Sequence, residues 1–441
     1  MAHVVTSFLR NRGQILLTRR SDAVGTYRGR WAGVSGYVEG DPADAERDAY
    51  RELREEVGLT DTDLAFVRAG DALAVDDEQG SFTVHPFLFE TGTRELTTNE
   101  ELAAVEWVDP TAIRDRATVP RLWETWLRVA PTVADVRDDR THGSAWIAAR
   151  ALEVLRDAAI EADDWAAVAE VARSLGDARP EMAAVPNRVN RVVAEVWQAT
   201  DDGTAPDPHA VAERAIDAIH DAFEADSGAA TTAATRLRDA DATAVATLSR
   251  SGTVREALAA LNPSTVVVAE SRPECEGVGV AEWTAAETDA WVTLTTEAAL
   301  PTALDDCDVD AVLVGADAVF PNGDVVNKTG TRVLALAARD VGVPVYAVAA
   351  RDKIRPAAID ESAATGGEHG DAERAPAATS PASAVYAGDA DVDVHAPTFE
   401  IVPGTLVDGV ATEAGLLGGR DVQAVAEAHA ANAAWDAERT D

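Results

Sequence analysis

The chain has 441 residues, and its 77 Asp and Glu residues outnumber its 38 Lys and Arg residues, so the formal net charge is -39. This charge argues against generic binding of nucleic acid, because no basic stripe or arginine-rich run accompanies it. The sequence has no apolar run of about 18 residues that could span a membrane. Its only cysteines, Cys275 and Cys307, are too few for a disulfide framework. We therefore expect a cytoplasmic protein of two or three domains, without a membrane partner.

The basic residues are strongly biased toward arginine, since only Lys328 and Lys353 are lysines. An acidic, lysine-poor chain is typical of a cytosol of very high salt, where a Debye length of about 3 Å at molar ionic strength screens the self-repulsion of the charges. We therefore hypothesise that the source is a halophilic archaeon. Stability measured against salt concentration tests this hypothesis, and full folding without salt would contradict it.

Residues 1–130 alternate between short β-type runs and one acidic helix, which is an α+β pattern. The expected strands and further β-type runs occupy residues 3–9, 14–18, 65–75, 82–91 and 105–109. The helix lies in the stretch 48–59, DAYRELREEVGL, where Ala49, Leu53 and Val57 recur at four-residue spacing. This spacing predicts an amphipathic helix with one buried face.

Three glutamates of this helix, Glu52, Glu55 and Glu56, stand at positions i, i+3 and i+4 and therefore project from one face. Like charges at this spacing destabilise a helix by roughly a few tenths of a kcal/mol, and a hard divalent cation with oxygen ligands would turn that repulsion into binding. In so acidic a chain, however, a glutamate cluster is more often plain solvated surface. Helix geometry alone leaves both interpretations open.

Three motifs in this order resemble the Nudix hydrolases: RGRWAGVSGYVEG at 28–40, RELREEVGL at 51–59 and TNEELAAVEWVDP at 98–110. The resemblance covers residues 1–130. The residues that match the Nudix box are Arg51, Glu52, Leu53, Glu55, Glu56, Gly58 and Leu59. The match of spacing and residue types favours metal binding over a solvated helix face.

The box departs from the family pattern at one place. Fourteen residues separate Gly36 from Arg51, where the family has thirteen, so the earlier box glutamate falls on Ala43. In the family this glutamate braces the loop against the box arginine. The candidates to replace it are Glu39, Asp41 and Glu46.

The resemblance implies an α+β Nudix fold, a mixed sheet with the box helix, that hydrolyses a phosphoanhydride with Mg2+ or Mn2+. Such hydrolysis uses the ion to neutralise diphosphate charge, polarise phosphorus and produce a hydroxide-like water. The implied metal site comprises Glu52, Glu55 and Glu56, with the Gly36 carbonyl and Glu39 nearby. Arg51 would orient Glu52, and the three box glutamates with Arg51 are the catalytic candidates.

Four residues outside the box are further candidates. Glu100 and Glu101 could supply a supplementary base or ligand, and Arg28 and Arg30 could meet substrate phosphates. A solvated surface position is the competing explanation for all four.

The chain from 141 to 240 is almost wholly helical by period and alanine content, with breaks at 178–187 and 201–208. After residue 240, short continuous apolar runs alternate with helical segments, which indicates a parallel sheet with helices on both faces. The apolar runs lie at 243–248, 264–270, 291–296, 311–317 and 343–350. Residues 359–386, rich in Gly, Ala, Ser and acid, are expected to form a flexible surface insertion rather than a site.

Six motifs between residues 140 and 441 resemble a second superfamily: HGSAWIA, TLSRSGTV, AESRPECEG, VGADAVFPNGDVVNKTGT, AVAARDKI and FEIVPGTLVDGVATEAG. This superfamily joins the regulatory subunits of translation initiation factor two-B with methylthioribose-1-phosphate isomerase and ribose-1,5-bisphosphate isomerase. The resemblance implies a helical subdomain at 140–240, a Rossmann-like α/β domain at 241–441, and a homo-oligomer formed through the C-terminal domain.

In the isomerases of this superfamily a cysteine and an aspartate form the acid-base pair. Asp317 matches the aspartate, whereas Ser249 occupies the cysteine position and Cys275 is out of register. A serine hydroxyl does not ionise near neutrality, so proton transfer by a thiol of pKa about 8.5 is lost.

Phosphate or sugar binding is implied for a larger set: Gly143, Ser144, Ser249, Arg250, Ser251, Arg272, Asn327, Lys328 and Lys353. The lysines support this independently, because a chain that uses arginine almost everywhere keeps them near the expected C-terminal ends of parallel strands, where ligands bind. The competing explanations are loop hydrogen bonds and, for the lysines, chance survival. His142 stands where the superfamily usually has arginine.

Three functions remain open. The first is a metal-dependent Nudix hydrolase of a nucleoside-diphosphate-linked substrate, with a C-terminal half that binds a phosphorylated sugar or nucleotide; ADP-ribose would unite the two halves. The second is a pentose-phosphate isomerase of the ribose-1,5-bisphosphate type. The third is a non-catalytic regulatory protein of the initiation factor kind. In each case the expected partners are phosphorylated small molecules.

Overall fold

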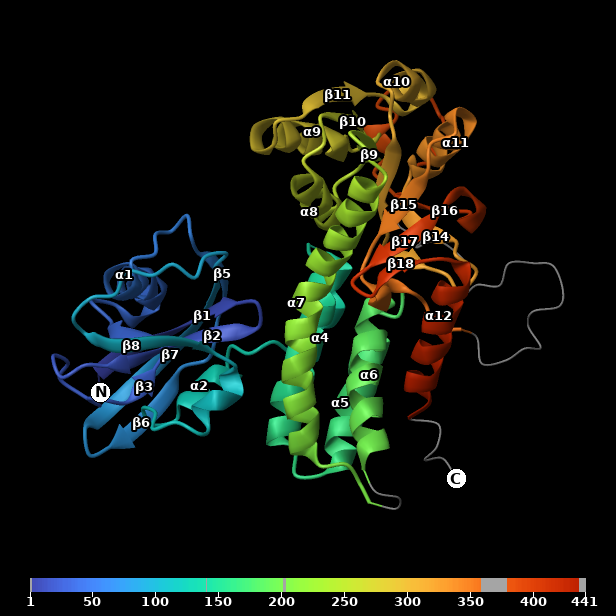
Figure 1. Ribbon diagram of the computed structural model, residues 1–441. Helices are drawn as coiled ribbons and strands as arrows, with labels where there is room; N and C mark the ends of the chain where they lie inside the picture. Colours follow the sequence, from blue (N-terminus) through green and yellow to red (C-terminus); the bar gives the residue numbers. More distant parts are fainter. Residues whose placement is uncertain (1, 140, 201–203, 358–378, 436–441) are drawn as a thin grey trace.

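The computed structural model describes residues 2–139, 141–200, 204–357 and 379–435. An N-terminal sheet domain lies beside a bundle of long helices, and a second sheet lies at one end of that bundle (Figure 1). The N-terminal domain and the C-terminal sheet both contact this helical layer.

The N-terminal domain is built on a mixed sheet. Its strands are β1 (Ala2–Asn11), β2 (Gln14–Arg20), β3 (Trp31–Ala32), β4 (Val34–Tyr37), β5 (Ala65–Ala69), β6 (Leu73–Asp77), β7 (Gly80–Glu90) and β8 (Leu102–Val108). The order is β3-β2-β1-β7-β5, with β4 beside β1, β6 beside β7 and β8 beside β2. The pair β1 and β7 is parallel, and the other pairs are antiparallel.

The acidic helix predicted at 48–59 is α1 (Ala45–Val57). Its buried side chains include Ala49, Leu53 and Val57, which pack with Val5 of β1 on one face of the sheet. The helix ends at Gly58, whose φ of 75° is left-handed and suits a residue without a Cβ. The other face of the sheet is covered by α2 (Leu122–Leu127), and α3 (Val133–Asp138) leads into the helical layer.

Four long helices follow, as the alanine-rich periodicity predicted: α4 (Ser144–Glu161), α5 (Trp165–Ala178), α6 (Ala184–Ala199) and α7 (Pro208–Asp239). They share one core of mainly Ala, Val and Leu. The small side chains allow the helix backbones to approach closely. The second half of α7 also packs against the C-terminal sheet, so this helix joins the two layers (Figure 1).

The predicted parallel sheet follows. Its strands are β9 (Ala244–Leu248), β10 (Thr265–Ala269), β11 (Trp291–Thr295), β12 (Ala311–Gly315), β15 (Val345–Val348), β17 (Gly409–Thr412) and β18 (Gly415–Leu417). The order is β11-β10-β9-β12-β15-β17-β18, and only β18 runs antiparallel to its neighbour. Because the order reverses between β9 and β12, the crevice beyond their C-terminal ends is a topological switch point, where such sheets bind ligands.

Helices cover both faces of this sheet, which explains why its strands are continuous apolar runs. They are α8 (Gly252–Leu261), α9 (Glu276–Glu287), α10 (Leu300–Asp306), α11 (Thr331–Val341) and α12 (Gly419–Ala433). A small antiparallel sheet of β13 (Ala318–Val319), β14 (Val325–Lys328) and β16 (Phe399–Val402) lies next to them.

The expected insertion at 359–386 lies outside the described residues as far as residue 378. Most of the described residues 379–386 are exposed, and Ser380 is buried. The backbone N–H of buried Ser380 donates to the Ala396 carbonyl, and its hydroxyl donates to Glu274 at 3.0 Å. This end of the insertion is therefore anchored to the C-terminal domain.

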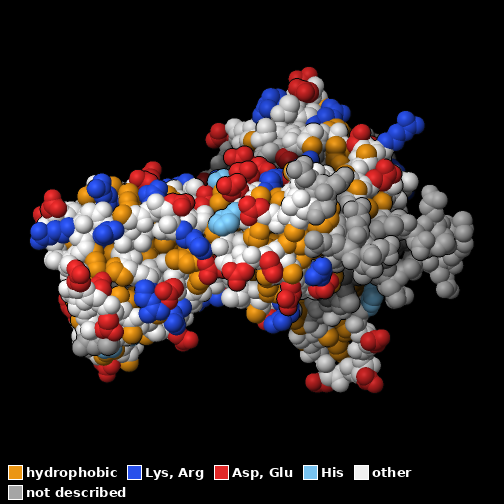
Figure 2. Space-filling model, turned by 90° about the horizontal axis from the view of Figure 1, so that it is seen from below, with side chains coloured by type: hydrophobic (Ala, Val, Ile, Leu, Met, Phe, Trp, Pro, Cys, Tyr) orange, Lys and Arg blue, Asp and Glu red, His pale blue; other side chains and the backbone are white. Residues whose placement is uncertain are grey.

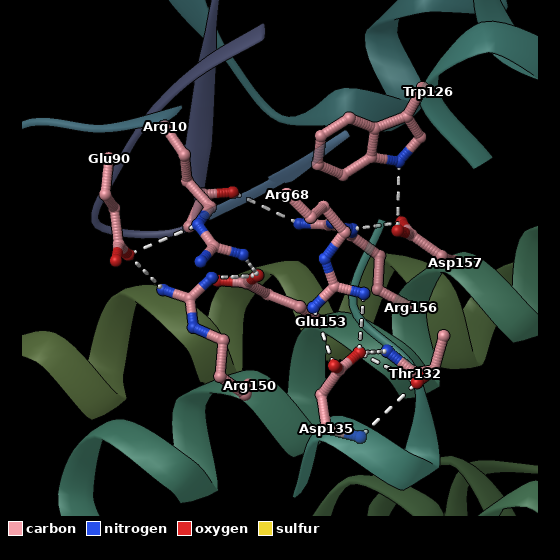
Figure 3. A network of polar contacts seen from close by, with 11 residues as sticks. Arg10, Arg68, Glu90, Trp126, Thr132, Asp135, Arg150, Glu153, Arg156 and Asp157 are labelled. Carbon is pink, nitrogen blue, oxygen red and sulfur yellow. Dashed lines mark hydrogen bonds and ion pairs between the residues drawn. The ribbon is translucent and has the colours of Figure 1, made fainter. Parts of the chain in front are cut away.

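A network of buried charged side chains joins the N-terminal sheet to α4 (Figure 3). Arg10 of β1 lies 3.2 Å from Glu90 of β7 and 3.4 Å from Glu153 of α4, and Arg150 pairs with both glutamates. The side chains of Arg10, Arg150 and Glu153 are at most 2% exposed. Desolvated ions are costly unless paired, so these contacts hold the domains in one register.

Among the described residues no helix is both long and apolar enough to cross a membrane. On the face drawn in Figure 2, acidic side chains are spread widely and basic ones lie among them. This distribution agrees with the acidic composition of the whole chain.

Candidate functional site

Two of the box glutamates are buried between α1 and the edge strand β4. Glu52 is 7% exposed and Glu56 is 2% exposed. The Glu52 carboxylate packs directly on Gly36, where any Cβ would overlap it, and Glu56 accepts a hydrogen bond from the backbone N–H of Ser35. The i, i+4 spacing thus places both carboxyl groups along one strand. Glu55 lies further out, with its side chain 57% exposed.

Burial shifts the acidity of both groups. Burial, together with the charges of Glu55 and Glu101, raises the pKa of Glu52 to about 7, against the opposing effect of the Arg51 charge. Burial likewise raises the pKa of Glu56 to about 8, with Glu52 and Glu101 adding to the effect. Two adjacent carboxyl groups are therefore partly protonated near neutrality. A divalent cation with oxygen ligands would favour their ionised forms, so the donor set fits Mg2+ or Mn2+.

The guanidinium of Arg51 lies among the carboxylates. Its Nη1 atom is 3.0 Å from Glu52, 3.5 Å from Glu55 and 3.7 Å from Glu39. In this arrangement the described residues contain no group of three or more His, Cys, Asp or Glu side chains close enough to hold a metal ion. The contact between Nη1 and Glu52 is the one through which Arg51 can orient that carboxylate.

Asp48 supplies the brace that the sequence lacks at Ala43. One carboxylate oxygen of Asp48 accepts from Arg51 Nε at 3.2 Å and Nη2 at 3.1 Å, and the other accepts from the backbone N–H of Glu39 at 3.0 Å. Of the three predicted substitutes, Glu39 makes only the long contact to Arg51, Asp41 accepts from the Ala43 N–H, and Glu46 is exposed on the helix.

The signal for Asp48 was present in the sequence. It stands three residues before Arg51 on the same helix face, a spacing at which opposite charges meet. The fold adds the reason: Asp48 is 4% exposed, at the point where the loop after β4 turns back onto α1.

The loop candidates separate into two groups. The charge of Glu101 raises the pKa of both Glu52 and Glu56. Glu100 makes a backbone contact instead, since its carbonyl accepts a hydrogen bond from the Ser21 hydroxyl. Arg28 and Arg30 line a different hollow, together with Asp77, Glu78 and Gln79. The structure therefore brings the charge of Glu101 close to the carboxylate pair. The two arginines line a separate hollow, which contains none of the box glutamates.

A second site lies in the C-terminal domain at the switch point. A cavity of about 350 Å³ opens beyond the ends of β9 and β12. Of the predicted phosphate-site and catalytic residues, it is lined by Gly143, Ser144, Ser249, Arg250, Ser251, Asp317, Asn327, Lys328 and Lys353. Arg272 is the exception: its backbone N–H donates to Glu297, and its exposed side chain lies outside the lining.

The turn after β9 is shaped to approach a ligand. Ser249 adopts a left-handed φ of 59°, and the Ser251 hydroxyl accepts from the Val254 N–H, capping α8. A Cβ at Gly315 would lie 2.9 Å from that hydroxyl, so the glycine permits the close approach. The N-termini of α8 and α4 both reach the cavity, and free backbone N–H groups there favour anions.

The two lysines of the chain meet in this cavity. Lys353 donates to the Ala316 carbonyl at 2.8 Å, and Lys328 lies 3.1 Å from Glu274 and 3.2 Å from Glu276. Burial raises the pKa of Asp317, both lysines lower it, and Glu276 raises it. The cavity thus combines two cations with carboxyl groups, as a polyhydroxylated phosphate would require.

The acidic side chains that line this cavity were not among the residues predicted from the sequence. Glu276 accepts a hydrogen bond from Ser249 at 2.8 Å, and Asp226 and Glu256 also line the cavity. One buried oxygen of Asp226 and the hydroxyl of Ser144 have no hydrogen-bond partner among the described residues. Glu276 flanks Cys275 within the quoted motif AESRPECEG, which was the available signal.

His142, at the position of the superfamily's arginine, does not line the cavity. Its Nδ1 atom lies 2.7 Å from Asp139, and its ring stacks on Trp146 with 3.7 Å between centroids. Its position is explained by these local contacts rather than by a ligand.

The comparisons with known proteins agree with the division into two parts. The model of the initiation factor 2 subunit family matches residues 140–419. The chain belongs to this family. The model of the NUDIX domain matches residues 2–127, so a NUDIX domain precedes the family domain.

Relatives of the family domain are isomerases by name. Ribose 1,5-bisphosphate isomerase of Haloferax volcanii is 31% identical over 65% of this chain and 88% of its own length. Methylthioribose-1-phosphate isomerases of Caldanaerobacter subterraneus and Thermosynechococcus vestitus are 31% and 33% identical over 38% and 37% of this chain. The chain spans 47% and 45% of these two enzymes, about half of their length.

A solved structure shows the fold of the same region. The translation initiation factor eIF-2B of Pyrococcus horikoshii OT3 is 23% identical to this chain, with a TM-score of 0.50 over 66% of this chain and 97% of that one. The likeness establishes the α/β architecture of the family domain.

Proposed function

We propose that this protein is a metal-dependent Nudix hydrolase of a nucleoside-diphosphate-linked substrate, fused to a domain that binds a phosphorylated sugar or nucleotide. The observation that supports the first part most strongly is the buried pair Glu52 and Glu56 on the edge of β4, with raised pKa values. Arg51 lies 3.0 Å from Glu52, yet burial still raises the pKa values of both carboxyl groups, so a cation-dependent role explains their position.

Each residue of the NUDIX site has its own role in the proposed hydrolysis. Glu52, Glu55 and Glu56 would hold Mg2+ or Mn2+ with the Gly36 carbonyl, and Glu39 lies near. The bound ion would neutralise the diphosphate and generate a nucleophilic water. Arg51, fixed by Asp48, orients Glu52. Glu101 faces the same cluster and is the candidate to take the proton of the attacking water.

Hydrolysis is expected to depend on a divalent ion. The purified full chain is incubated with a panel of nucleoside-diphosphate-linked compounds, ADP-ribose included, and with Mg2+ or Mn2+. A chelator should reduce turnover to background, and added metal should restore it. Turnover that persists in the chelator would contradict the metal-dependent mechanism.

Phosphosugar binding at the second site is supported by the composition of the cavity, because Lys328, Lys353 and the N-termini of α4 and α8 all line it. Phosphosugar binding is expected to raise the melting temperature of the protein, because a ligand that binds only the folded state stabilises it. Lys328→Gln should weaken the affinity for ribose 1,5-bisphosphate by about 10- to 100-fold, since a charge-assisted hydrogen bond contributes about 1.5–3 kcal/mol.

Arg339→Gln provides the matched control, because it also removes one positive charge from an exposed position in the family domain, outside the cavity lining. Equal weakening by both variants would indicate a general charge effect and contradict the assignment of Lys328. Calorimetric titration measures the affinities.

A second candidate function, isomerisation of a ribose-1,5-bisphosphate-type sugar, is favoured by the Haloferax relative and by Asp317 in the cavity lining. The Ser249 hydroxyl donates a hydrogen bond to Glu276 and would remain neutral. The same binding samples decide between isomerase and regulatory domain: exchange of sugar carbon-bound hydrogen with solvent indicates catalysis, and binding without exchange indicates a sensor.

A further inference from the structure

The serine at the superfamily's cysteine position is bonded to a carboxylate. Ser249 follows β9, and Glu276 begins α9 after the neighbouring strand β10. The Ser249 hydroxyl donates to Glu276 at 2.8 Å, and both residues line the cavity at the switch point. The backbone N–H of Ser249 donates to the Ser271 hydroxyl at 2.6 Å, which holds the turn in place. The position that lacks a thiol therefore lies beside a group that can exchange a proton.

One oxygen of Glu276 makes the contacts that hold this side chain. Oε2 accepts from Ser249 and lies 3.2 Å from Nζ of Lys328. Within the part of the chain that the structure describes, Oε1 has no hydrogen bond or ion pair. The side chain is 22% exposed. The carboxylate is thus fixed through one oxygen, and the other is available to a ligand in the cavity that Glu276 lines.

A second carboxyl group lies close to Glu276 in the same cavity. Burial raises the pKa of Asp317, the ammonium groups of Lys353 and Lys328 lower it, and the charge of Glu276 raises it. Lys328 thus acts on Asp317 and also contacts Glu276. Two carboxyl groups in different surroundings of one site form an arrangement in which one can donate a proton and the other can accept one.

Nearby glutamates are placed differently. Glu256 also lines the cavity, but its carboxylate accepts from the Ser227 hydroxyl at 2.7 Å. Glu274 pairs with Lys328 at 3.1 Å, but it is not part of the cavity lining. Of these three glutamates, Glu276 is the one that both lines the cavity and contacts the cysteine position.

We infer that Glu276 is a catalytic acid-base residue of this cavity, the partner of Asp317 in place of the superfamily's thiol. The inference rests on the second candidate function, isomerisation, and it names a residue that the family resemblance does not supply. Ser249 is then a positioning residue, whose hydroxyl orients the Glu276 carboxylate.

The proton transfers of the isomerisation balance with these two groups. Asp317 gives its proton to the ring oxygen of the sugar as the bond between that oxygen and carbon 1 breaks. Glu276 takes the proton from carbon 2, and the electron pair of that C–H bond forms a double bond between carbons 1 and 2. Glu276 then returns a proton to carbon 1, while the 2-hydroxyl gives its proton to Asp317 as the 2-keto group forms. Both carboxyl groups end in their starting states.

The test measures conversion of ribose 1,5-bisphosphate to its 2-ketose by the full-length protein. Glu276→Gln should lower kcat by about 10²- to 10⁴-fold, the range expected for loss of an acid-base group. The amide keeps the size of the side chain, so the affinity for the sugar, measured by calorimetry, should change far less than kcat. Glu276→Asp retains a carboxyl group and should recover part of the lost turnover.

Glu274→Gln is the matched control, because it makes the same change two residues away and also removes a carboxylate partner of Lys328. Its kcat should equal that of wild type, since Glu274 lies outside the cavity lining. The double variant Ser249→Cys with Glu276→Gln should regain at least about tenfold in kcat over Glu276→Gln, because a thiol can carry the proton. A structural role of Glu276 predicts no such recovery, since the thiol does not restore the contact to Lys328.

Two kinds of failure can be told apart. Equal turnover in wild type and Glu276→Gln, an equal loss in Glu274→Gln, or a double variant without recovery would overturn the role of Glu276 and leave the isomerase function standing. If wild type binds the sugar and forms no ketose, isomerisation itself is refuted, and the role of Glu276 is refuted with it.

Discussion

Glu56→Gln is expected to lower the turnover of the diphosphate substrate by about 10²- to 10⁴-fold, the range typical of removing a group that assists proton transfer or holds the activating ion. Glu56 is 2% exposed and contacts the backbone of β4, so no neighbouring water can replace its oxygen easily. Steady-state kinetics at saturating Mg2+ measures the effect.

Unfolding cannot explain that loss. Burial raises the pKa of Glu56 to about 8 in the folded protein, above its ordinary value of 4.5. Without metal, the carboxyl group therefore costs stability increasingly as pH rises from its unfolded pKa through its folded pKa. An amide has no such cost, so metal-free Glu56→Gln should melt no lower than wild type at pH 8.

Glu46→Gln is the matched control, because it makes the same change at an exposed position in the first turn of α1. Its turnover should equal that of wild type. Undiminished hydrolysis in Glu56→Gln, or an equal loss in both variants, would remove the metal-site assignment.

Glu153→Gln is expected to destabilise the protein by about 3–5 kcal/mol, the cost of removing one partner from a buried ion pair. Glu153 lies between Arg10 of the NUDIX domain and Arg150 of α4, and each of the three side chains is almost fully buried (Figure 3). An amide would leave two desolvated guanidinium groups that share Glu90 as their remaining ion-pair partner among the described residues. Chemical denaturation measures the change in unfolding free energy.

Glu161→Gln is the control on the same helix. Glu161 also joins α4 to the NUDIX domain, through Arg114 and Trp123, but its side chain is 44% exposed. A surface pair of this kind contributes about 0–1 kcal/mol, so this variant should be close to wild type. Equal destabilisation by both variants would show that burial of the network is not what holds the domains together.

The box helix could be predicted from local sequence. The four-residue spacing of Ala49, Leu53 and Val57 defined its buried face, and the spacing of the glutamates defined their common face. Both are consequences of helical geometry, which depends only on positions along the chain. The contact between Asp48 and Arg51 is equally local. It was not predicted because the family pattern places the bracing carboxylate in the loop before the helix.

The family resemblance predicted some of the residues that line the cavity and not others. Five of the nine predicted residues, Ser249, Arg250, Ser251, Asp317 and Lys353, follow the parallel strands β9, β12 and β15, which end at one edge of the sheet. The other four come from the start of α4 (Gly143 and Ser144) and from β14 of the antiparallel sheet (Asn327 and Lys328). Glu276, Asp226 and Glu256 are absent from that prediction, since each lies on a helix whose packing brings it to the cavity. Arg272 shows the converse, a motif residue whose side chain lies outside the lining.

The sequence by itself determined the chain's acidic character, the order of a mixed-sheet domain, a helical layer and a parallel sheet, and the two groups of candidate residues. The acidic character and the order of the elements follow from composition, periodicity and spacing, which act over a few residues, whereas the mixed sheet and the second group of candidate residues were implied by the family resemblances. Only the tertiary structure decided that Arg10 meets Glu153 and that Glu276 faces Ser249. Such contacts join residues far apart in the chain, and they exist because burying apolar faces and pairing buried charges requires the packed domains together.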